Sequence, residues 1–382
     1  MSKKSSSKTN FLAQGTILVI ASFVAKAIGM IYRIPLTHIL GDDGNGYYST
    51  ANEIYTIILM ISSFSLPLAV SRLVAEREYA GEVKNSYKVL ICSLRFAAVT
   101  GGILSILTFL LGGVITKYVM GVELASYALR VLAPAIFLFA LTGVLRGFFQ
   151  GHGTMVPTAV SQIIEQIFVA TFALLMSHVF IQHFSATGDM DLVHRWGAAG
   201  ATMGTGAGVA SALIFMLIVY GVNRKIIRKR IVNDRHSVNE SMGHVMSNIV
   251  LIIMPIILSA FIYNVNGYIN SYMYSGIMDI KGAAKDVIQT LYSEYGYYMT
   301  LINIPLTLAS TAPTSMIPEV SAHYAMHDIE GANMKTDRAT WISMLISIPA
   351  AVGLAVLSGP ITRLIFPGTN GVGGQLLILG GI

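Results

Sequence analysis

Nine apolar segments, each long enough to cross a bilayer as a helix, constrain this chain more than any other feature of its sequence. A spanning helix needs about 20 apolar residues to cross about 30 Å of hydrocarbon. The predicted spans are residues 11–34, 48–71, 89–115, 125–146, 157–181, 197–222, 246–274, 288–316 and 341–366. A tenth apolar run begins near Gly374 and stops at Ile382, too soon to cross. We therefore expect a C-terminally truncated chain, with more helices beyond Ile382.

The composition agrees with an all-α integral membrane protein. Hydrophobic residues make up 54% of the chain and charged residues only 12%, whereas about 25% of a soluble protein is charged. The 36 glycines suit helices that pack closely in lipid. The single cysteine, Cys92, excludes an internal disulfide and a multi-cysteine metal site. The basic tail at residues 1–10 precedes a first span without a signal-peptide cleavage pattern.

Basic residues between the spans predict the topology. With the N-terminus inside, the inner segments hold 16 Lys and Arg residues and the outer segments hold four. The positive-inside rule then places the N-terminus in the cytoplasm. The most basic inner segment runs from Asn223 to His244, after the sixth span. We interpret its charge as a topology anchor, with a specific lipid-binding site as the alternative.

Two pseudo-symmetric lobes are predicted on either side of this basic segment. We expect a cytoplasmic tail at 1–10, an N-terminal six-helix lobe at 11–222, a cytoplasmic connector at 223–245 and an incomplete C-terminal lobe at 246–382, which would hold helices seven to nine and the start of a tenth. The sequence Gly-Tyr-Tyr at 46–48 recurs at 296–298, and Pro67 has a counterpart in Pro318 at nearly the same offset. Paired six-helix halves are a recurrent transporter plan.

The first predicted span carries two cations, Lys26 and Arg33, seven residues apart with Gly29 between them. At about 100° per residue, the two side chains leave the helix within roughly 20° of each other. A charge at the bilayer centre costs about 2.5–3.5 kcal/mol on insertion scales. The pair therefore favours a water-filled or ligand-filled cavity over lipid. The alternative is that both side chains extend to the head groups.

Two carboxylates also lie within predicted spans. Glu53, in the second span, is expected either to pair with Arg33 or to contact a substrate or ion. Glu165, in the fifth span, is a candidate for coupling to an ion gradient, because ionisable groups inside a membrane are usually functional. The alternative for Glu165 is a structural ion pair with a cation such as Arg95 or Arg130.

The seventh predicted span is the most polar, and it contains Asn264, Asn266 and Asn270. Amides of this kind can bind a sugar or a pyrophosphate, or can coordinate a sodium ion together with backbone carbonyls. They can equally form hydrogen bonds between helices. We name all three as candidate substrate-binding residues and leave these alternatives open.

No catalytic constellation is present in the sequence. It contains no zinc-protease motif, nucleophile elbow or nucleotide phosphate loop. We therefore predict a non-enzyme without a cofactor or bound metal, and leave open coupling to a sodium or proton gradient. The basic residues lie in short loops, so we expect no nucleic-acid partner. A membrane glycosyltransferase or ligase is the enzyme alternative, but it would need paired carboxylates or a large outer loop.

The first 80 residues resemble a known family through three motifs: Lys26-x-x-Gly29-x-x-x-Arg33, Gly41-Asp42-Asp43-Gly44, and Pro67 followed by Ala75-Glu76. They resemble the polysaccharide-export branch of the multidrug/oligosaccharidyl-lipid/polysaccharide (MOP) superfamily, and within it the SpoVB-like and MurJ-like lipid-linked precursor flippases. The resemblance implies a MATE-like bundle of two lobes around a central cavity that works by alternating access. It also implies a place in the bacterial cytoplasmic membrane.

The substrate that the resemblance implies is an undecaprenyl-pyrophosphate-linked sugar, such as lipid II or a related cell-wall, spore-cortex or polysaccharide precursor. It would move from the inner to the outer leaflet. Lys26 and Arg33 approximately match two cavity arginines of MurJ-like members. The segment from Thr56 to Ile61 has no arginine where those members carry one, which favours a related glycan or the sporulation branch. The implied partners are this lipid-linked oligosaccharide, membrane lipids and the cell-wall synthesis or sporulation machinery.

The nearest rival is a multidrug or cation antiporter of the same fold. Such a protein should favour acidic groups in its cavity, because its cargo is cationic. The first span here is basic, which favours an anionic head group held by cations in a low-dielectric cavity.

Overall fold

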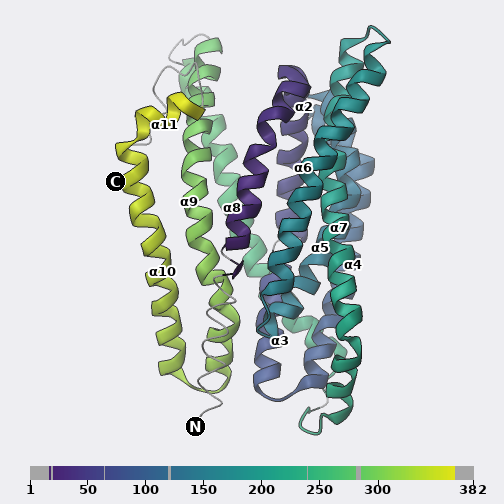
Figure 1. Ribbon diagram of the computed structural model, residues 1–382, viewed down its shortest axis with the longest axis vertical. Helices are drawn as coiled ribbons and strands as arrows, with labels where there is room; N and C mark the ends of the chain where they lie inside the picture. Colours follow the sequence, from purple (N-terminus) through teal and green to yellow (C-terminus); the bar gives the residue numbers. More distant parts are fainter. Residues whose placement is uncertain are drawn as a thin grey trace. The chain divides into compact units, whose positions relative to one another are not determined.

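The computed structural model describes residues 17–365 apart from 19, 64, 119–121, 239 and 281–284. Residue 42, many residues between 260 and 318, and residues from 363 on are described without their side chains. A helix over residues 20–31 comes first. It is followed by α2 (Arg33–Ser62), α3 (Leu66–Tyr79), α4 (Val83–Tyr118), η1 (Glu123–Ala125), α5 (Ser126–Gly151), α6 (Val156–Ser185), α7 (Met190–Asn233), α8 (Met242–Ile280), α9 (Lys285–Ala325), α10 (Ile329–Val356) and α11 (Ser358–Ile365), as drawn in Figure 1.

Eight helical stretches in the described part of the chain are long and apolar enough to cross a membrane. They are Ile20–Gly41, Asp43–Tyr79, Val83–Tyr118, Glu123–Gly151, Val156–Ser185, Met190–Asn233, Met242–Ser259 and Ile329–Val356. These overlap the first seven predicted spans and the ninth. The eighth, at 288–316, falls in α9, where the shorter segment Leu301–Ser310 is apolar. The prediction of an all-α, multi-pass membrane protein is confirmed.

The first span ends later than predicted. Its helix continues past residue 34 and stops at Gly41, whose backbone has φ 65° and ψ −178°. Glycine adopts this positive φ without the steric cost of a Cβ atom, so the chain reverses in a tight bend there. The only earlier interruption is at Tyr32, where Pro35 cannot donate a hydrogen bond to the carbonyl of Ile31. Arg33 therefore lies well inside the span rather than at its end.

A second interruption separates α2 from α3. Pro67 occupies the first turn of α3, and the helix is broken between Ser62 and Leu66. Proline is tolerated there because the first turn needs no N–H donor. The helix is therefore interrupted just before Pro67.

Glycines on α7 bring this helix against α6. A Cβ atom at Gly204 would lie 2.5 Å from the backbone nitrogen of Ala173, and one at Gly200 would lie 2.7 Å from the carbonyl of Met176. Gly197 and Gly208 are equally closed in, whereas Gly206 has open space around it. Within the glycine run at 204–208, Gly204 and Gly208 thus form a face that packs closely against α6.

The chain divides into two compact units. The first comprises residues 1–261 and 317–329, and the second comprises 262–316 and 330–382. The beginning of α8 belongs to the first unit, because Val245, Ile249 and Ile253 are at most 1% exposed in a core shared with α3, α4, α5 and α7. The predicted connector is also partly helical, since α7 continues to Asn233.

Candidate functional site

One side of the first helix, residues 20–31, contacts polar side chains of α6. The Ser22 hydroxyl donates a hydrogen bond to Gln162 Oε1 at 3.1 Å. About two turns further along, a Cβ atom at Gly29 would lie 3.3 Å from Gln166 Oε1. A membrane helix thus places small residues next to half-buried amides, an arrangement typical of closely packed polar helix pairs.

Lys26 and Arg33 lie along the edge of this contact. The spacing Ser22, Lys26, Gly29, Arg33 follows the i, i+4, i+7, i+11 pattern of one helix face. Both cationic side chains are exposed at the surface of the first unit. Neither forms an ion pair with any carboxylate among the residues that the structure describes. They are thus two uncompensated cations on one stripe of a membrane span.

Glu53 belongs to a second exposed polar stripe, which lies on α2. Ser49, Glu53 and Thr56 follow one helix face, and all three are exposed. Thr56 donates its hydroxyl hydrogen to the Asn52 carbonyl at 2.8 Å, a bond internal to the helix. The ion pair considered between Arg33 and Glu53 is not formed in the described part of the chain. Contact of Glu53 with a substrate or ion stays a prediction.

Glu165 is held in a buried ion pair between α5 and α6. Its Oε2 lies 2.7 Å from Arg146 Nη2, and the two side chains are 13% and 8% exposed. The guanidinium also donates from Nε to Ser161 Oγ at 2.9 Å. The expected partners, Arg95 and Arg130, were wrong. Arg146 was counted as a loop cation because the fourth span was predicted to end there, whereas α5 continues to Gly151.

Two further polar groups are buried on α2 near this ion pair. The Tyr55 hydroxyl is close enough to Glu165 to interact electrostatically. Within the described residues, neither this hydroxyl nor the Asn52 Nδ2 atom has a hydrogen-bond partner. A buried donor without a partner costs about 1–3 kcal/mol.

The three amides of the seventh predicted span lie in α8. The backbone at Asn264, Asn266 and Asn270 is helical, as expected for a spanning segment. Their side chains lie outside the part of the chain that the structure describes. Their assignment to substrate binding stays a prediction.

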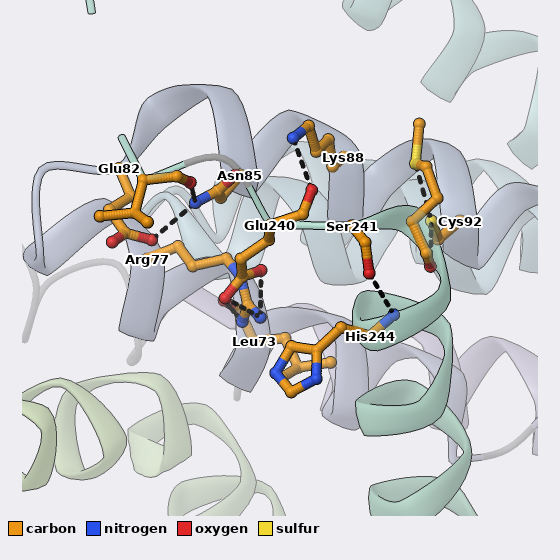
Figure 2. A network of polar contacts seen from close by, with 11 residues as sticks. Leu73, Arg77, Glu82, Asn85, Lys88, Cys92, Glu240, Ser241 and His244 are labelled. Carbon is orange, nitrogen blue, oxygen red and sulfur yellow. Dashed lines mark hydrogen bonds and ion pairs between the residues drawn. The ribbon is translucent and has the colours of Figure 1, made fainter. Parts of the chain in front are cut away.

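Residues 234–242, hereafter the connector strap, are attached to α3 and α4 by a network of hydrogen bonds and ion pairs. The sequence did not predict this network. Figure 2 shows Arg77 reaching Glu240, with Nε at 3.2 Å and Nη2 at 2.9 Å from Oε2. Lys88 Nζ donates to the Glu240 carbonyl at 2.7 Å, and the Asn85 amide donates to the Val238 carbonyl at 2.6 Å. Arg77 and Lys88 were counted only among the basic residues that set the membrane topology. Nothing in their local sequence indicates a partner about 160 residues away.

The start of the connector strap is organised by Asp234. Its carboxylate accepts hydrogen bonds from the Ser237 hydroxyl and from the backbone N–H groups of Lys84, His236 and Ser237. These donors favour the ionised form and hold the pKa of Asp234 well below its ordinary value. The Lys84 ammonium adds a bond to the Asp234 carbonyl at 2.9 Å. Asp234 thus ends α7 and joins it to the beginning of α4.

Next to this turn, Glu78 at the end of α3 contacts two basic side chains. It forms an ion pair with Arg230 of α7, and its other oxygen lies 3.2 Å from His152 Nε2 at the end of α5. Three helix ends therefore meet at one carboxylate. This contact fixes the orientation of the C-terminal end of α7.

The chain is similar to curated proteins of bacterial envelope biology. It is 24% identical over 366 residues to stage V sporulation protein B of Bacillus subtilis strain 168, with 95% of this chain and 68% of the relative covered. It is also 24% identical over 359 residues to the lipid II flippase MurJ of the same organism, with 91% and 65% covered. The chain thus spans about two thirds of the length of these relatives.

Solved structures show the same fold. A MATE protein in its straight conformation superposes with a TM-score of 0.71 at 16% identity, covering 98% of this chain and 78% of that protein. A MOP superfamily transporter from Pyrococcus furiosus superposes with a TM-score of 0.69 at 16% identity, covering 96% and 76%. The predicted MATE-like bundle is confirmed.

The family of this protein is identified by a match that covers most of the chain. A family model described as polysaccharide biosynthesis protein matches residues 11–322. This agrees with the resemblance seen in the first 80 residues and with the relatives and structures above. The chain therefore belongs to the polysaccharide biosynthesis protein family.

Proposed function

We propose that this protein is a flippase that moves an undecaprenyl-pyrophosphate-linked sugar from the inner to the outer leaflet of the bacterial cytoplasmic membrane. The observation that carries the proposal is the stripe of two exposed, unpaired cations, Lys26 and Arg33, inside a membrane span. Relatives named as a lipid II flippase and a sporulation protein support the substrate class. The N-terminus is proposed to face the cytoplasm, as the distribution of basic residues favours.

The spacing of the two cations suits a head group that moves along the helix. Seven residues correspond to a rise of about 10 Å, which is longer than a pyrophosphate group. The two side chains can therefore hold the anion at successive positions or bind its two ends. A charge-assisted hydrogen bond is stronger in a site of low dielectric constant than in water. The sugar would be bound by amides such as Asn264, Asn266 and Asn270, while the lipid tail stays in the bilayer.

An ion gradient is proposed as the driving force, with Glu165 as the coupling residue. The support is its burial near Tyr55, whose hydroxyl lacks a hydrogen-bond partner among the described residues. Protonation of Glu165 would weaken its pair with Arg146, which links α5 to α6. A sodium ion coordinated at Asn52 is the alternative form of the same coupling. Transport measured with either gradient collapsed separately distinguishes the two.

Transport by the reconstituted full-length protein tests the function. Liposomes would contain a labelled lipid-linked sugar, and an external probe would report its arrival in the opposite leaflet. We expect Lys26→Ala or Arg33→Ala to slow transport about ten-fold or more, since a hydrogen bond to a charged group contributes about 1.5–3 kcal/mol. Lys117→Ala removes an exposed cation that pairs with Glu123 at the end of α4, and it should leave transport unchanged. Wild-type rates in both the Lys26 and the Arg33 variants would refute the anion site.

A multidrug antiporter of the same fold is the second candidate. The observation in its favour is Glu53, an exposed carboxylate without an ion pair among the described residues. A cationic drug could bind there. Efflux of a fluorescent organic cation that is lost in Glu53→Gln, with no lipid transport, would support this candidate instead.

A further inference from the structure

The C-terminal end of α7 extends beyond the membrane as a basic helix. The helix has 44 residues, which corresponds to about 66 Å. A bilayer measures about 40–45 Å including its head groups. The apolar part of the helix ends near residue 222, and the next eight residues include five cations: Arg224, Lys225, Arg228, Lys229 and Arg230. These cations therefore lie at the level of the head groups or just outside them.

A pocket opens between this basic end and the turn that joins α3 to α4. Its volume is about 580 Å³, and its walls are formed by Gly81, Val83, Ile226, Lys229, Arg230, Asn233, Asp234 and His236. The four α7 residues follow the i, i+3, i+4, i+7 pattern of one helix face. Gly81 has a φ of 79° and no side chain, which leaves the opposite wall open. A head group of several polar atoms fits a volume of this size.

The acidic residue that lines the pocket, Asp234, already has other partners. Its carboxylate accepts bonds from Ser237, His236 and Lys84. Glu78, which is not part of the lining, pairs with Arg230. Lys229 is exposed, and no ion pair to it is formed within the described residues. Its ammonium is therefore available to an anion from outside the protein.

The helix dipole does not account for all of this charge. The C-terminal end of a helix carries about half an elementary negative charge, and its effect fades within the last turn. Arg230, in the last turn of α7, already pairs with Glu78. The ammonium of Lys229 adds a full positive charge to the same pocket.

Apolar side chains border the basic end. Val222, Ile226 and Val232 are 74%, 62% and 72% exposed, and Ile226 also lines the pocket. A soluble partner would leave these side chains in water. The boundary between head groups and acyl chains suits both the cations and the exposed aliphatic groups.

We propose that this pocket binds the phosphate head group of an anionic phospholipid in the leaflet at the C-terminal end of α7. Lys229 contacts the phosphate, Asn233 and His236 offer further donors, and Ile226 contacts the start of an acyl chain. The site is separate from the stripe of Lys26 and Arg33 and would serve as an anchor for a structural lipid. This lipid site is additional to the proposed transport function. It also gives a location to the specific lipid-binding site that was the alternative interpretation of the basic connector.

Native mass spectrometry of the detergent-solubilised full chain tests this site. The probes are phosphatidylglycerol and phosphatidylcholine with identical acyl chains. We expect the wild-type chain to retain phosphatidylglycerol in preference to phosphatidylcholine. Lys229→Gln should weaken phosphatidylglycerol binding about five-fold, as one basic residue near an anionic surface contributes about 1 kcal/mol. Lys229 is exposed, so this variant should keep the wild-type elution profile and melting temperature.

Arg228→Gln is the matched control, because it removes the same charge from the neighbouring position. Arg228 is two residues from both Ile226 and Arg230, which places it about 160° around the helix from each. It should retain phosphatidylglycerol within about two-fold of wild type, whereas Lys229→Gln should not. Equal losses in the two variants would show general electrostatic attraction and overturn the site.

Three further outcomes would also overturn the proposal. Equal retention of both lipids, which both carry a phosphate, would show that the pocket does not select an anionic head group. Displacement of phosphatidylglycerol by inorganic phosphate would indicate a free-anion site. Binding of a polyprenyl pyrophosphate, but not phosphatidylglycerol, at Lys229 would assign the pocket to the transported substrate. Transport by Lys229→Gln in the liposome assay separates failure of this site from failure of the flippase function.

Discussion

Arg146 and Glu165 form the most deeply buried ion pair that joins two described membrane helices, with 8% and 13% of their side chains exposed. Removing two charges from water costs several kcal/mol per ion, which only close and well-bonded partners offset. Here the contact is 2.7 Å, and Ser161 accepts a further bond from the guanidinium. Such a pair contributes little net stability, but it fixes how α5 and α6 are placed.

Breaking this pair on one side should therefore be costly. We expect Arg146→Leu or Glu165→Leu to destabilise the protein by about 3–5 kcal/mol, because each leaves one buried charge without a partner. The double variant should recover much of that loss. A double-mutant cycle of denaturant unfolding in detergent measures this coupling. Additive losses in the double variant would mean that the two residues act independently.

The two cations of the first helix differ from this buried ion pair, because they are exposed and unpaired among the described residues. Lys26 and Arg33 are exposed and have no ion pair among the described residues. Their presence and common helix face follow from spacing alone, because a helix repeats about every 3.6 residues. The partner of Glu165 could not be predicted in this way. The identity of this partner depends on which helices pack together. Arg146 stood at the predicted end of a span, so its charge was assigned to a loop.

At the scale of the element, α6 and α7 are joined by a stripe of small residues. Gly197, Gly200, Gly204 and Gly208 each have atoms of α6 where a Cβ would stand. In lipid, helices gain little from hydrophobic exclusion, so close van der Waals packing of small residues holds them together. The two helix backbones are therefore close along about eleven residues of α7.

Gly204→Ala tests this packing. The added Cβ would lie 2.5 Å from Ala173 N and 2.6 Å from its Cβ, so one helix must shift, and we expect a loss of about 1–3 kcal/mol. Gly206→Ala, two residues away, has no atom within 4 Å of the new Cβ and should be neutral or slightly stabilising. Thermal unfolding in detergent compares the two. A neutral Gly204→Ala would mean that the helices can separate at no cost.

The helices themselves were the most predictable part of the fold. Apolar runs of about 20 residues identify spans, because every backbone polar group in lipid must be paired internally. Helix ends were less predictable. Gly41 was read as part of a loop, yet the helix continues through Thr37 and His38 and reaches it. Likewise α7 continues to Asn233 through a basic segment that had been read as a connector.

At the scale of the whole molecule, the connector strap belongs to the first unit. Arg77, Asn85 and Lys88 bind its backbone and side chains (Figure 2), and the division between units falls at 261 and 262, inside α8. These contacts join residues separated by about 150 positions, so no local pattern predicts them. The basic residues showed only that the segment lies next to a membrane.

The attachment of the strap should depend on pH through Asp234. Its pKa is lowered in the folded state, so the unfolded state binds the proton more readily, and stability rises with pH. The contribution is complete above the unfolded value of about 3.9 and is lost as the pH falls below it. The difference in melting temperature between wild type and Asp234→Asn should be constant near neutral pH and shrink below about pH 4. A constant difference down to pH 3 would contradict this.

The early residues of α8 also affect how the protein is made. Val245, Ile249 and Ile253 complete a core whose other members are encoded well upstream, beginning with Leu66 of α3. A nascent chain that has emerged only as far as α7 therefore has an open apolar groove in its first half. The core of that half can be completed only after translation has released about twenty more residues. The first half therefore finishes folding after the early part of α8 has been synthesised, and not when the sixth span is complete.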